Sequence, residues 1–340
     1  MTEKDILSLL NWYQENKRDL PWRKTKDAYK IWLSEVMLQQ TGVQTVISYY
    51  EKFLKVCPDL VSLSKIDTEK VLKLWEGLGY YHRALNLQKC AQKLVSLDYT
   101  NLPDDKSLLE TLPGLGPYTV GAILSICYDE LEPAIDGNVK RVLSRVYEEK
   151  GDISKPKLLK EYTEKLRVLM QKGQTRDFTE AFIELGATLC SSKKTPLCEK
   201  CPLNKCCGAY HHESVSLYPV KAKKSVKKEE DLTMLVFRYQ NKYVIYKREE
   251  KLLKGMYAFY SLKGHLDEEE IKSQTSFNIK CITYKGKVSH TFSHIIWNMQ
   301  VYLVELLKKP SKELLVSKDE LDTVYSMPTA YKKVFLKILD

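Results

Sequence analysis

Long apolar runs are missing from this sequence of 340 residues. No stretch approaches the roughly 18 apolar residues that a membrane-spanning helix needs. The first residues, MTEKDILSLLNWYQENKRDLPW, have neither the apolar core of a signal peptide nor the Arg-rich, acid-free composition of a transit peptide. We therefore expect an intracellular, cytoplasmic protein with no membrane partner, associated with the nucleoid if its source is bacterial.

Strand-like alternation is also missing from the first 207 residues. Apolar residues there recur every three or four positions, as in ILSLLNWY, TVGAILSICY and NVKRVLSRVY, which predicts helices throughout. Residues 211–230 lose this periodicity and concentrate lysines, a pattern typical of an exposed linker. Strand patterns follow: LTMLVFRY and KYVIYKRE flank Gln240-Asn241 as a hairpin, more strand extends to Leu307, and a helix closes the chain.

Acidic residues are outnumbered by basic ones. Lysine and arginine total 54 against 44 acidic residues, a net charge of +10, which favours a polyanionic partner. The stretch TLPGLGPYTVGAI at 111–123 places Gly114 and Gly116 just before an apolar helix. Bare N–H groups at a helix start can bind a phosphate, although the same residues also suit a plain helix–helix turn. The stretch alone leaves both interpretations open.

Disulfides are not expected in a reducing compartment, so the cysteines need another explanation. Cys190, Cys198, Cys201 and Cys207 follow the spacing C-x7-C-x2-C-x5-C. One C-x2-C with two outlying cysteines suits a 4Fe–4S cluster better than zinc, which usually takes paired C-x2-C units. Cys206 is a possible fifth donor, and the remaining cysteines are expected in apolar cores.

Two carboxylates stand out by their surroundings. Glu35, in KIWLSEVMLQQ, lies on a helix among apolar neighbours, and desolvation there would raise its pKa as a general acid requires. Asp136, in EPAIDGNVKRVLSRVY, precedes an apolar helix and is a natural N-cap, whose backbone donors would keep it ionised. Such a pair can divide acid and cation-stabilising roles in glycosidic bond cleavage. Each residue alone also has an ordinary structural interpretation, as a cap or as an exposed glutamate.

Several motifs together resemble the A/G-specific adenine DNA glycosylases. The motifs are LPWR, SEVMLQQT, WEGLGYYHRALNL, LPGLGPYTVGAI, AIDGNVKRVLSR, IELGA, the four cysteines and a later FSH. The resemblance implies a multi-domain protein: an all-α helix-hairpin-helix glycosylase domain at 1–210, a linker at 211–230, and an α+β Nudix-like domain at 231–340. Within the first domain it implies a helix-hairpin-helix at 105–128 and a 4Fe–4S loop at 190–207. The first cysteine spacing is one residue longer than usual in the family, so the loop before Cys198 must bulge.

The resemblance also implies roles for individual residues. Glu35 would protonate a flipped adenine and later help to activate water, Asp136 would stabilise the sugar cation, and Tyr118 and Asn138 would support them. Tyr118 stands where lyase relatives carry a lysine, and a phenol cannot form a Schiff base, so no strong lyase activity is expected. The remaining matches are residues of the base pocket (Arg23, Glu184), of duplex wedging (Gln40, Leu78, Tyr80) and of phosphate binding (Gly114, Gly116). For the wedging residues an ordinary place at a helix end or in a core is a rival explanation.

The C-terminal part is expected to read the opposite base. Phe292, Ser293 and His294 match the family's recognition loop for 8-oxoguanine, and the metal-binding motif of true Nudix hydrolases, G-x5-E-x7-R-E-x2-E-E, does not occur. The implied partner is double-stranded DNA with adenine opposite 8-oxoguanine or guanine, bound by a monomer. Two alternatives remain: a thymine-mismatch or oxidised-pyrimidine glycosylase of the same superfamily, and a DNA-binding protein with a structural cluster and no chemistry.

Overall fold

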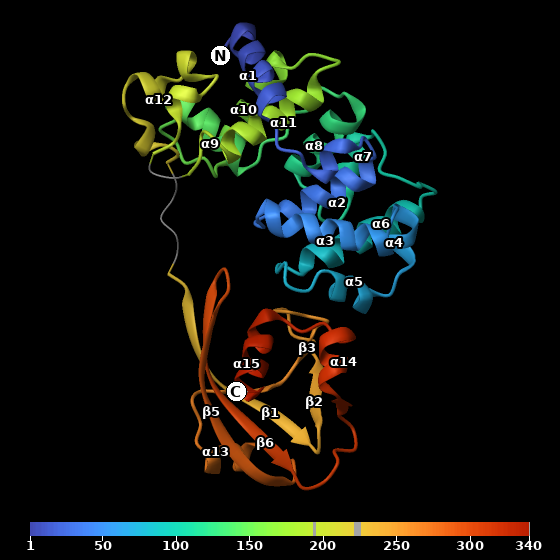
Figure 1. Cartoon of the computed structure of the whole chain (residues 1–340). Helices are drawn as coiled ribbons and strands as arrows, with labels where there is room; N and C mark the ends of the chain where they lie inside the picture. The colour runs from blue at the N-terminus through green and yellow to red at the C-terminus, as the bar shows by residue number, and fades with distance from the viewer. Residues whose placement is uncertain (193–194, 221–225, 340) are drawn as a thin grey trace. The chain divides into compact units, whose positions relative to one another are not determined.

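The computed structural model describes residues 1–192, 195–220 and 226–339 (Figure 1). They form two compact units, the first made of residues 1–65 and 86–223 and the second of residues 66–85 and 224–340. The second unit therefore draws a short segment from the predicted helical domain, which the predicted boundary at residue 210 did not anticipate. Within the described ranges, no helix is both long and apolar enough to cross a bilayer.

The first unit is helical, as predicted. Its longer helices are α1 (Glu3–Asn16), α2 (Ala28–Leu38), α3 (Val43–Val56), α8 (Pro117–Tyr128), α9 (Gly137–Val146), α10 (Pro156–Leu169) and α11 (Thr175–Ala187). Short helices are α4 (Leu60–Lys65), α7 (Lys106–Thr111) and α12 (Gly208–His211), and α6 (His82–Val95) crosses the unit boundary at Leu85. A buried core joins α1, α9, α10 and α11.

The pair α7 and α8 forms a helical hairpin at the predicted place. Asp105 caps α7 by accepting from Leu108 N, and Pro117 stands at the first turn of α8, where a missing N–H costs nothing. Gly114 in the turn has φ +80°, and a Cβ there would lie 2.9 Å from Cβ of Asn86. Both the backbone conformation and the close approach therefore require glycine at 114.

The second unit is built on a mixed sheet. The strands β1 (Lys228–Tyr239), β2 (Lys242–Lys247), β5 (Ile279–Thr291) and β6 (Ile295–Leu306) form its centre, with the sheet order β3-β2-β1-β6-β5. Shorter strands are β3 (Tyr257–Ala258), β4 (Tyr260–Lys263) and β7 (Leu314–Val316). β1 and β6 pair in parallel, whereas every other pair is antiparallel.

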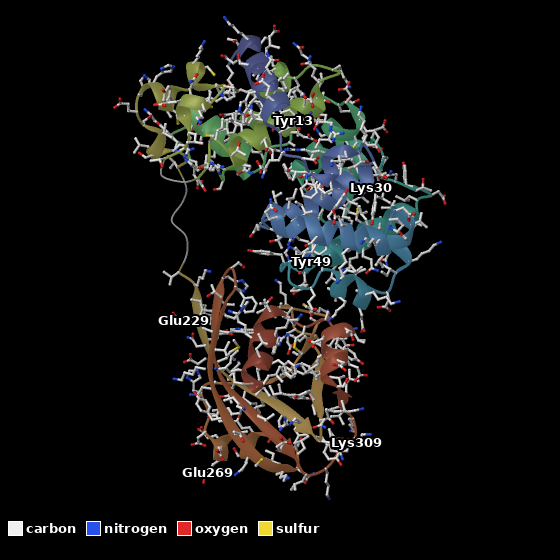
Figure 2. All side chains as sticks on the ribbon, viewed as in Figure 1. Tyr13, Lys30, Tyr49, Glu229, Glu269 and Lys309 are labelled. Carbon is white, nitrogen blue, oxygen red and sulfur yellow. The ribbon has the colours of Figure 1, made fainter. Side chains whose placement is uncertain are left out.

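Helices complete this unit. α15 (Thr329–Leu339) packs against the sheet through a core that includes Tyr331, Val334 and Phe335, and the smaller α13 (Glu268–Gln274) places Ile271 in a second core. α14 (Lys318–Thr323) and α5 (Thr68–Leu74) are the other helices of the unit. Charged side chains such as Glu229, Glu269 and Lys309 are exposed at its surface (Figure 2).

The predicted hairpin around Gln240 and Asn241 is confirmed. Arg238 pairs with Tyr243 and Tyr239 with Lys242, so the two residues form the turn, and Gln240 has φ +54°. The predicted linker is shorter than expected at its end, because β1 already begins at Lys228 and pairs with β6 there. Residues 221–225 of that linker lie outside the described residues.

Candidate active site

One pocket of about 760 Å³ in the helical unit gathers most of the predicted site residues. Such a volume is typical of a small-ligand site. The predicted residues that line it are Arg23, Glu35, Gln40, Gly114, Gly116, Tyr118, Asp136 and Asn138. They come from segments far apart in the sequence, at the ends of α2 and η1 (Pro21–Lys24), the turn before α8 and the start of α9.

Glu35 lies on α2, where Asp27 caps the helix and nearly every side chain is buried. Its own side chain is almost fully buried, and burial raises the pKa of this carboxyl from 4.5 to about 7. The hydrogen bond from Tyr118 opposes this shift, while the negative charge of Asp136 adds to it. Glu35 is thus a carboxyl that holds a proton near neutral pH, as its apolar surroundings predicted.

Tyr118, the second residue of α8, is the partner that orients Glu35. Its hydroxyl donates to Glu35 Oε2 at 2.5 Å. Burial and the adjacent carboxylates raise the pKa of the phenol well above 10, so it remains a neutral donor. This hydrogen bond fixes the orientation of the Glu35 carboxyl.

Asp136 caps α9 as predicted. Its Oδ1 accepts from the backbone N–H groups of Asn138 and Val139, both at 2.8 Å, and its Oδ2 accepts from Asn138 Nδ2 at 2.7 Å. The cap favours the anion, as expected from the sequence, but burial outweighs its hydrogen bonds, so the pKa of Asp136 is raised above 3.8 and not lowered. Its hydrogen bonds oppose the rise and favour the anion, whereas the Glu35 anion is favoured by the hydrogen bond from Tyr118 and by the charge of Arg23.

Asn138 is itself held by an arginine that the sequence did not single out. Arg141 Nη2 donates to Asn138 Oδ1 at 2.9 Å and to the carbonyl of Gly186 at 2.7 Å, and its Nε donates to the carbonyl of Cys190 at 2.9 Å. A Cβ on Gly186 would meet Cβ of Asn138 at 2.6 Å, so glycine lets α11 approach α9 at this point. Arg141 follows Asn138 by one helical turn, the spacing that could have indicated it.

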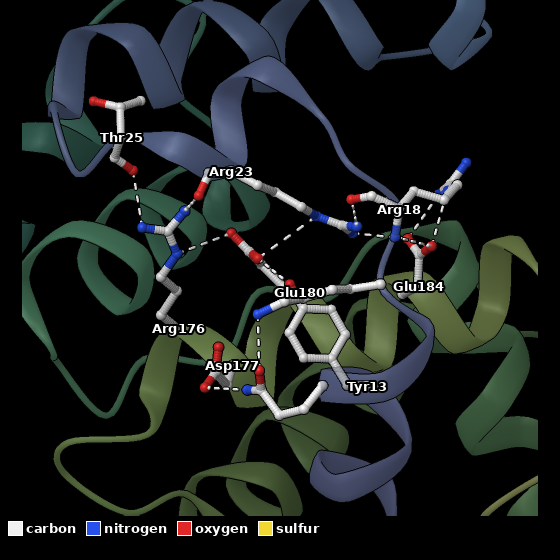
Figure 3. Close-up of polar contacts among 10 residues, drawn as sticks. Tyr13, Arg18, Arg23, Thr25, Arg176, Asp177, Glu180 and Glu184 are labelled. Atoms are coloured by element: carbon white, nitrogen blue, oxygen red, sulfur yellow. Dashed lines mark hydrogen bonds and ion pairs between the residues drawn. The ribbon is translucent and has the colours of Figure 1, made fainter.

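Glu184 does not line the pocket but lies behind it. It is fully buried on α11 and accepts from Arg23 Nη2 at 2.7 Å, and from Arg18 Nε at 2.6 Å and Nη2 at 2.7 Å (Figure 3). The pKa of Glu184 is lowered because these two guanidinium groups outweigh the cost of its burial. Both arginines line the pocket, and Arg18 was not predicted.

Glu180, one turn before Glu184, completes this charged wall. It accepts a hydrogen bond from the Tyr13 hydroxyl, lies 3.2 Å from Arg176 Nε and 3.6 Å from Arg23 Nε, and lines the pocket (Figure 3). The sequence offered one signal for it, namely two glutamates four residues apart on a largely apolar helix. Its arginine partners could not be paired from the sequence.

The four predicted cysteines, Cys190, Cys198, Cys201 and Cys207, line one small pocket in the first unit. Arg145, which lines it too, is buried and donates from Nη1 to Cys190 Sγ at 3.3 Å. Cys206 does not line this pocket, and its thiol donates to the carbonyl of Leu203. Within the described ranges, no three side chains converge as ligands of one metal ion. Residues 193–194 of the predicted bulge before Cys198 are outside the described residues.

The predicted wedging residues are not all in one place. Gln40 follows α2, is exposed with φ +59°, and lines the pocket. Leu78 and Tyr80 belong to the second unit, where Leu78 is buried and Tyr80 is exposed with φ +48°. The buried position of Leu78 is that of a core residue.

Phe292, Ser293 and His294 form the turn between β5 and β6, with Phe292 N donating to the carbonyl of Ile295 at 2.8 Å. The Phe292 ring packs against Trp297, 4.8 Å between centroids, and so anchors the turn. Ser293 and His294 are exposed, with Ser293 Oγ 3.2 Å from His294 Nδ1. Ser293 therefore lies at the tip of this turn.

The raised pKa of Glu35 predicts a pH-dependent effect on stability. The folded protein holds this proton more tightly than the unfolded chain, so the wild type loses stability as pH rises from 4.5 to about 7. Glu35→Gln removes that loss, and its free energy of unfolding relative to wild type should increase by about 2–3 kcal/mol between pH 5 and pH 8. Urea unfolding at both pH values measures this, with the exposed Glu15→Gln as control. A Glu35→Gln difference that stays constant with pH would contradict the raised pKa.

Comparisons with known proteins agree with this arrangement. Residues 33–167 match the family described as HhH-GPD superfamily base excision DNA repair protein, and residues 232–337 match the NUDIX domain. Among solved structures, a thermostable thymine-DNA glycosylase is similar with 27% identity and a TM-score of 0.56, covering 61% of this chain and 95% of its own. An endonuclease III bound to DNA, at 18% identity and a TM-score of 0.53, shares the fold over 63% of this chain and 98% of its own.

Curated relatives extend across both units. The adenine DNA glycosylase of Buchnera aphidicola subsp. Schizaphis graminum is 36% identical over 85% of this chain and 85% of its own length. The adenine DNA glycosylase of Arabidopsis thaliana is 31% identical over 98% of this chain and 64% of its own length. By its helix-hairpin-helix and Nudix parts and by its similarity to these relatives over most of its length, this chain belongs to the adenine DNA glycosylase family.

Proposed function

We propose that this protein is a base-excision repair enzyme that hydrolyses the N-glycosidic bond of adenine opposite 8-oxoguanine or guanine in double-stranded DNA. The observation that carries the proposal is the pair of carboxyls in one pocket, Glu35 protonated near neutral pH and Asp136 held by three hydrogen bonds. Adenine in a stacked duplex is out of reach of such a pocket, so the nucleotide must be flipped into it.

Glu35 supplies the proton. Tyr118 holds the carboxyl in place through Oε2, and the proton of the neutral acid is available to N7 of a flipped adenine, which makes the base a better leaving group. After cleavage the ionised carboxylate accepts a proton from water as the water attacks the sugar. The desolvated pocket keeps the pKa of this carboxyl close to 7, so it can both give and take the proton.

Asp136 opposes the positive charge that develops on the sugar. Two backbone N–H groups and the Asn138 amide fix the orientation of its carboxylate, so no reorganisation is needed when the cation forms. Arg141 in turn fixes Asn138 through its Oδ1. Tyr118 offers a phenol with a strongly raised pKa where a lyase needs an amine, and the enzyme should therefore stop after base removal.

DNA binding is supported by features beside the pocket. Gly114 and Gly116 line its rim in the turn that enters α8, where a glycine backbone leaves amides accessible to a backbone phosphate. The net charge of +10 favours the same partner. Gln40 and Tyr80, exposed and with positive φ, are suited to enter the duplex as a base leaves it, whereas Leu78 would have to leave its buried place. Arg18, Arg23 and Glu180 would bound the base pocket, with Glu184 behind the two arginines. The protein would act as a monomer.

The second unit would read the opposite base. Phe292 anchors the β5–β6 turn on Trp297, which leaves Ser293 and His294 at the tip as hydrogen-bonding groups for an edge of 8-oxoguanine. Discrimination by one or two hydrogen bonds is worth roughly 1–3 kcal/mol.

The four pocket-lining cysteines fit a 4Fe–4S cluster. All four residues line one small pocket, so their thiolates would be the ligands of such a cluster. Cys190, Cys198, Cys201 and Cys207 would hold it, and the buried guanidinium of Arg145 would offset the negative charge at Cys190. Bound there, the cluster would fix the loop that follows α11 and, through the carbonyl of Cys190, the Arg141 side chain.

The catalytic proposal predicts that Glu35→Gln and Asp136→Asn abolish excision while leaving duplex binding intact. Glutamine cannot transfer the proton, and asparagine cannot oppose a cation, so single-turnover rates should fall at least about a thousandfold. The assay uses adenine opposite 8-oxoguanine, guanine and thymine, with and without alkali, and strand breaks should require alkali.

The same assay tests the reading of the opposite base. Wild type should excise adenine fastest opposite 8-oxoguanine, and Ser293→Ala should reduce its preference for 8-oxoguanine over guanine about tenfold.

Near-normal excision by either carboxyl variant would contradict the role proposed for that residue. If the wild type left adenine intact but excised thymine or an oxidised pyrimidine, the proposed substrate would be wrong. Exposed Glu15→Gln serves as the matched control and should cut like wild type.

The proposed 4Fe–4S cluster leads to a prediction about the iron content of the protein. Protein purified anaerobically should be brown and contain about four iron and four sulfide per chain. Cys201→Ser should lose the colour and the iron, whereas Cys206→Ser should keep both because its thiol lies outside the pocket. Stoichiometric zinc without iron would show that the pocket holds a different centre.

A further inference from the structure

The second compact unit joins two parts of the chain that are far apart in sequence. Residues 66–85, which contain α5 and the loop with Leu78 and Tyr80, belong to the same unit as the sheet that carries the 292–294 turn. Neither the motifs nor the family resemblance assigns a role to the contact between these two parts.

Glu76 is the centre of this contact. Its side chain is 9% exposed, and its Oε2 lies 2.9 Å from both Lys73 Nζ and Lys332 Nζ. Its Oε1 accepts from the backbone N–H of Met327 at 2.7 Å. A largely buried carboxylate with two ammonium partners and one backbone donor is fixed in place. The partners Lys332 and Met327 come from about 250 residues further along the chain.

Residues of α5, just before Glu76, widen the contact. Lys73 Nζ donates to the carbonyls of Leu321 at 3.3 Å and Tyr325 at 3.0 Å. Glu69 Oε1 accepts from Lys247 Nζ at 2.7 Å and from the Tyr257 hydroxyl at 2.9 Å. The apolar side of α5 is buried as well, at Val71 and Leu72. α5 is therefore attached to the C-terminal part along its length.

The loop after Glu76 has a defined shape. Gly77, Gly79 and Tyr80 all have positive φ, and Trp75 Nε1 donates to the carbonyl of Gly79 at 3.2 Å. Arg83 is buried under this loop, donates from Nη2 to the carbonyls of Leu78 and Gly79, and lies over the Tyr80 ring at 5.5 Å. These contacts hold the loop together, and Glu76 lies at its base.

We propose that Glu76 is a positioning residue that ties the loop of residues 77–81 to the C-terminal domain, so that binding of the opposite base by that domain sets the place of Tyr80 in the duplex. The inference rests on the proposed function. It adds that lesion recognition is passed to Tyr80 through the charged contact that Glu76 makes next to α5. Deleting residues 231–340 would remove the partners of Glu76 and disturb the loop as well as the lesion-reading turn.

The test compares Glu76→Gln and Lys332→Met with wild type and with Glu305→Gln, all in the full-length protein. Glutamine can still accept from Met327 N–H but presents an amide N–H₂ to two ammonium groups, so the tie weakens. Lys332 is half exposed, and its loss leaves Glu76 paired with Lys73, which keeps the unit folded. Glu305 is the control, because its pair with Arg238 lies within the β1–β6 sheet of the same unit and does not touch α5.

Two measurements are made: single-turnover excision of adenine opposite 8-oxoguanine and opposite guanine, and amide hydrogen exchange of peptides covering residues 75–85. For Glu76→Gln we expect faster exchange at 77–81, and excision opposite 8-oxoguanine reduced roughly tenfold with a smaller loss opposite guanine. Lys332→Met should show the same change to a lesser degree, and Glu305→Gln should behave as wild type.

An excision ratio equal to that of wild type in Glu76→Gln and Lys332→Met would overturn the proposal, whatever the exchange result. A ratio that narrows equally in Glu305→Gln would also overturn it, since the effect would then be general loss of stability. If the proposed function is wrong, the wild type will not excise adenine, which is a separate result. Hydrogen exchange still tests in that case whether Glu76 holds the loop of residues 77–81.

Discussion

The removal of water from one carboxyl, that of Glu35, is the constraint on which the active site depends. Helix α2 buries it, and a hydrogen bond from Tyr118 compensates in part. A carboxyl in bulk water would be ionised at neutral pH and could not protonate a base. The second carboxyl, Asp136, is nearly as enclosed, but its three hydrogen bonds at the start of α9 stabilise the anion. The two carboxyls of this pocket thus differ in hydrogen bonding more than in burial, and the hydrogen bonds of Asp136 favour its anion.

Around this pair, buried ion pairs hold the side chains of the pocket wall in place. Glu184 is fully enclosed and would be costly to bury alone, yet Arg18 and Arg23 satisfy both of its oxygens. The same guanidinium groups form the pocket wall, so their positions are fixed from behind. Arg141 acts similarly on the other side, where it links Asn138 to the carbonyls of Gly186 and Cys190.

Local patterns in the sequence predicted the features that depend on neighbouring residues. The helix of Glu35, the cap at Asp136, the hairpin around Gln240 and the four cysteines all have such signals, and the structure places each accordingly. The direction of the Asp136 pKa shift was missed because capping can be seen in a sequence, whereas burial by distant helices cannot.

Contacts between residues far apart in the chain could not be predicted from the sequence. Arg18 meets Glu184 across 166 positions, and Met327 N–H meets Glu76 across 251. Nothing periodic marks either pair, since each depends on how separate elements pack. For the same reason the compact units cut across the predicted boundary, with residues 66–85 held by partners in the C-terminal part.

The central claim, that a neutral Glu35 delivers the proton, is tested most directly by the pH dependence of single-turnover adenine excision with saturating enzyme. Because the reaction needs the protonated acid, the rate constant should be constant at low pH and fall as pH rises through about 7. A rate constant that does not fall between pH 6 and pH 9 would contradict the account, because an ionised Glu35 would then be compatible with full activity.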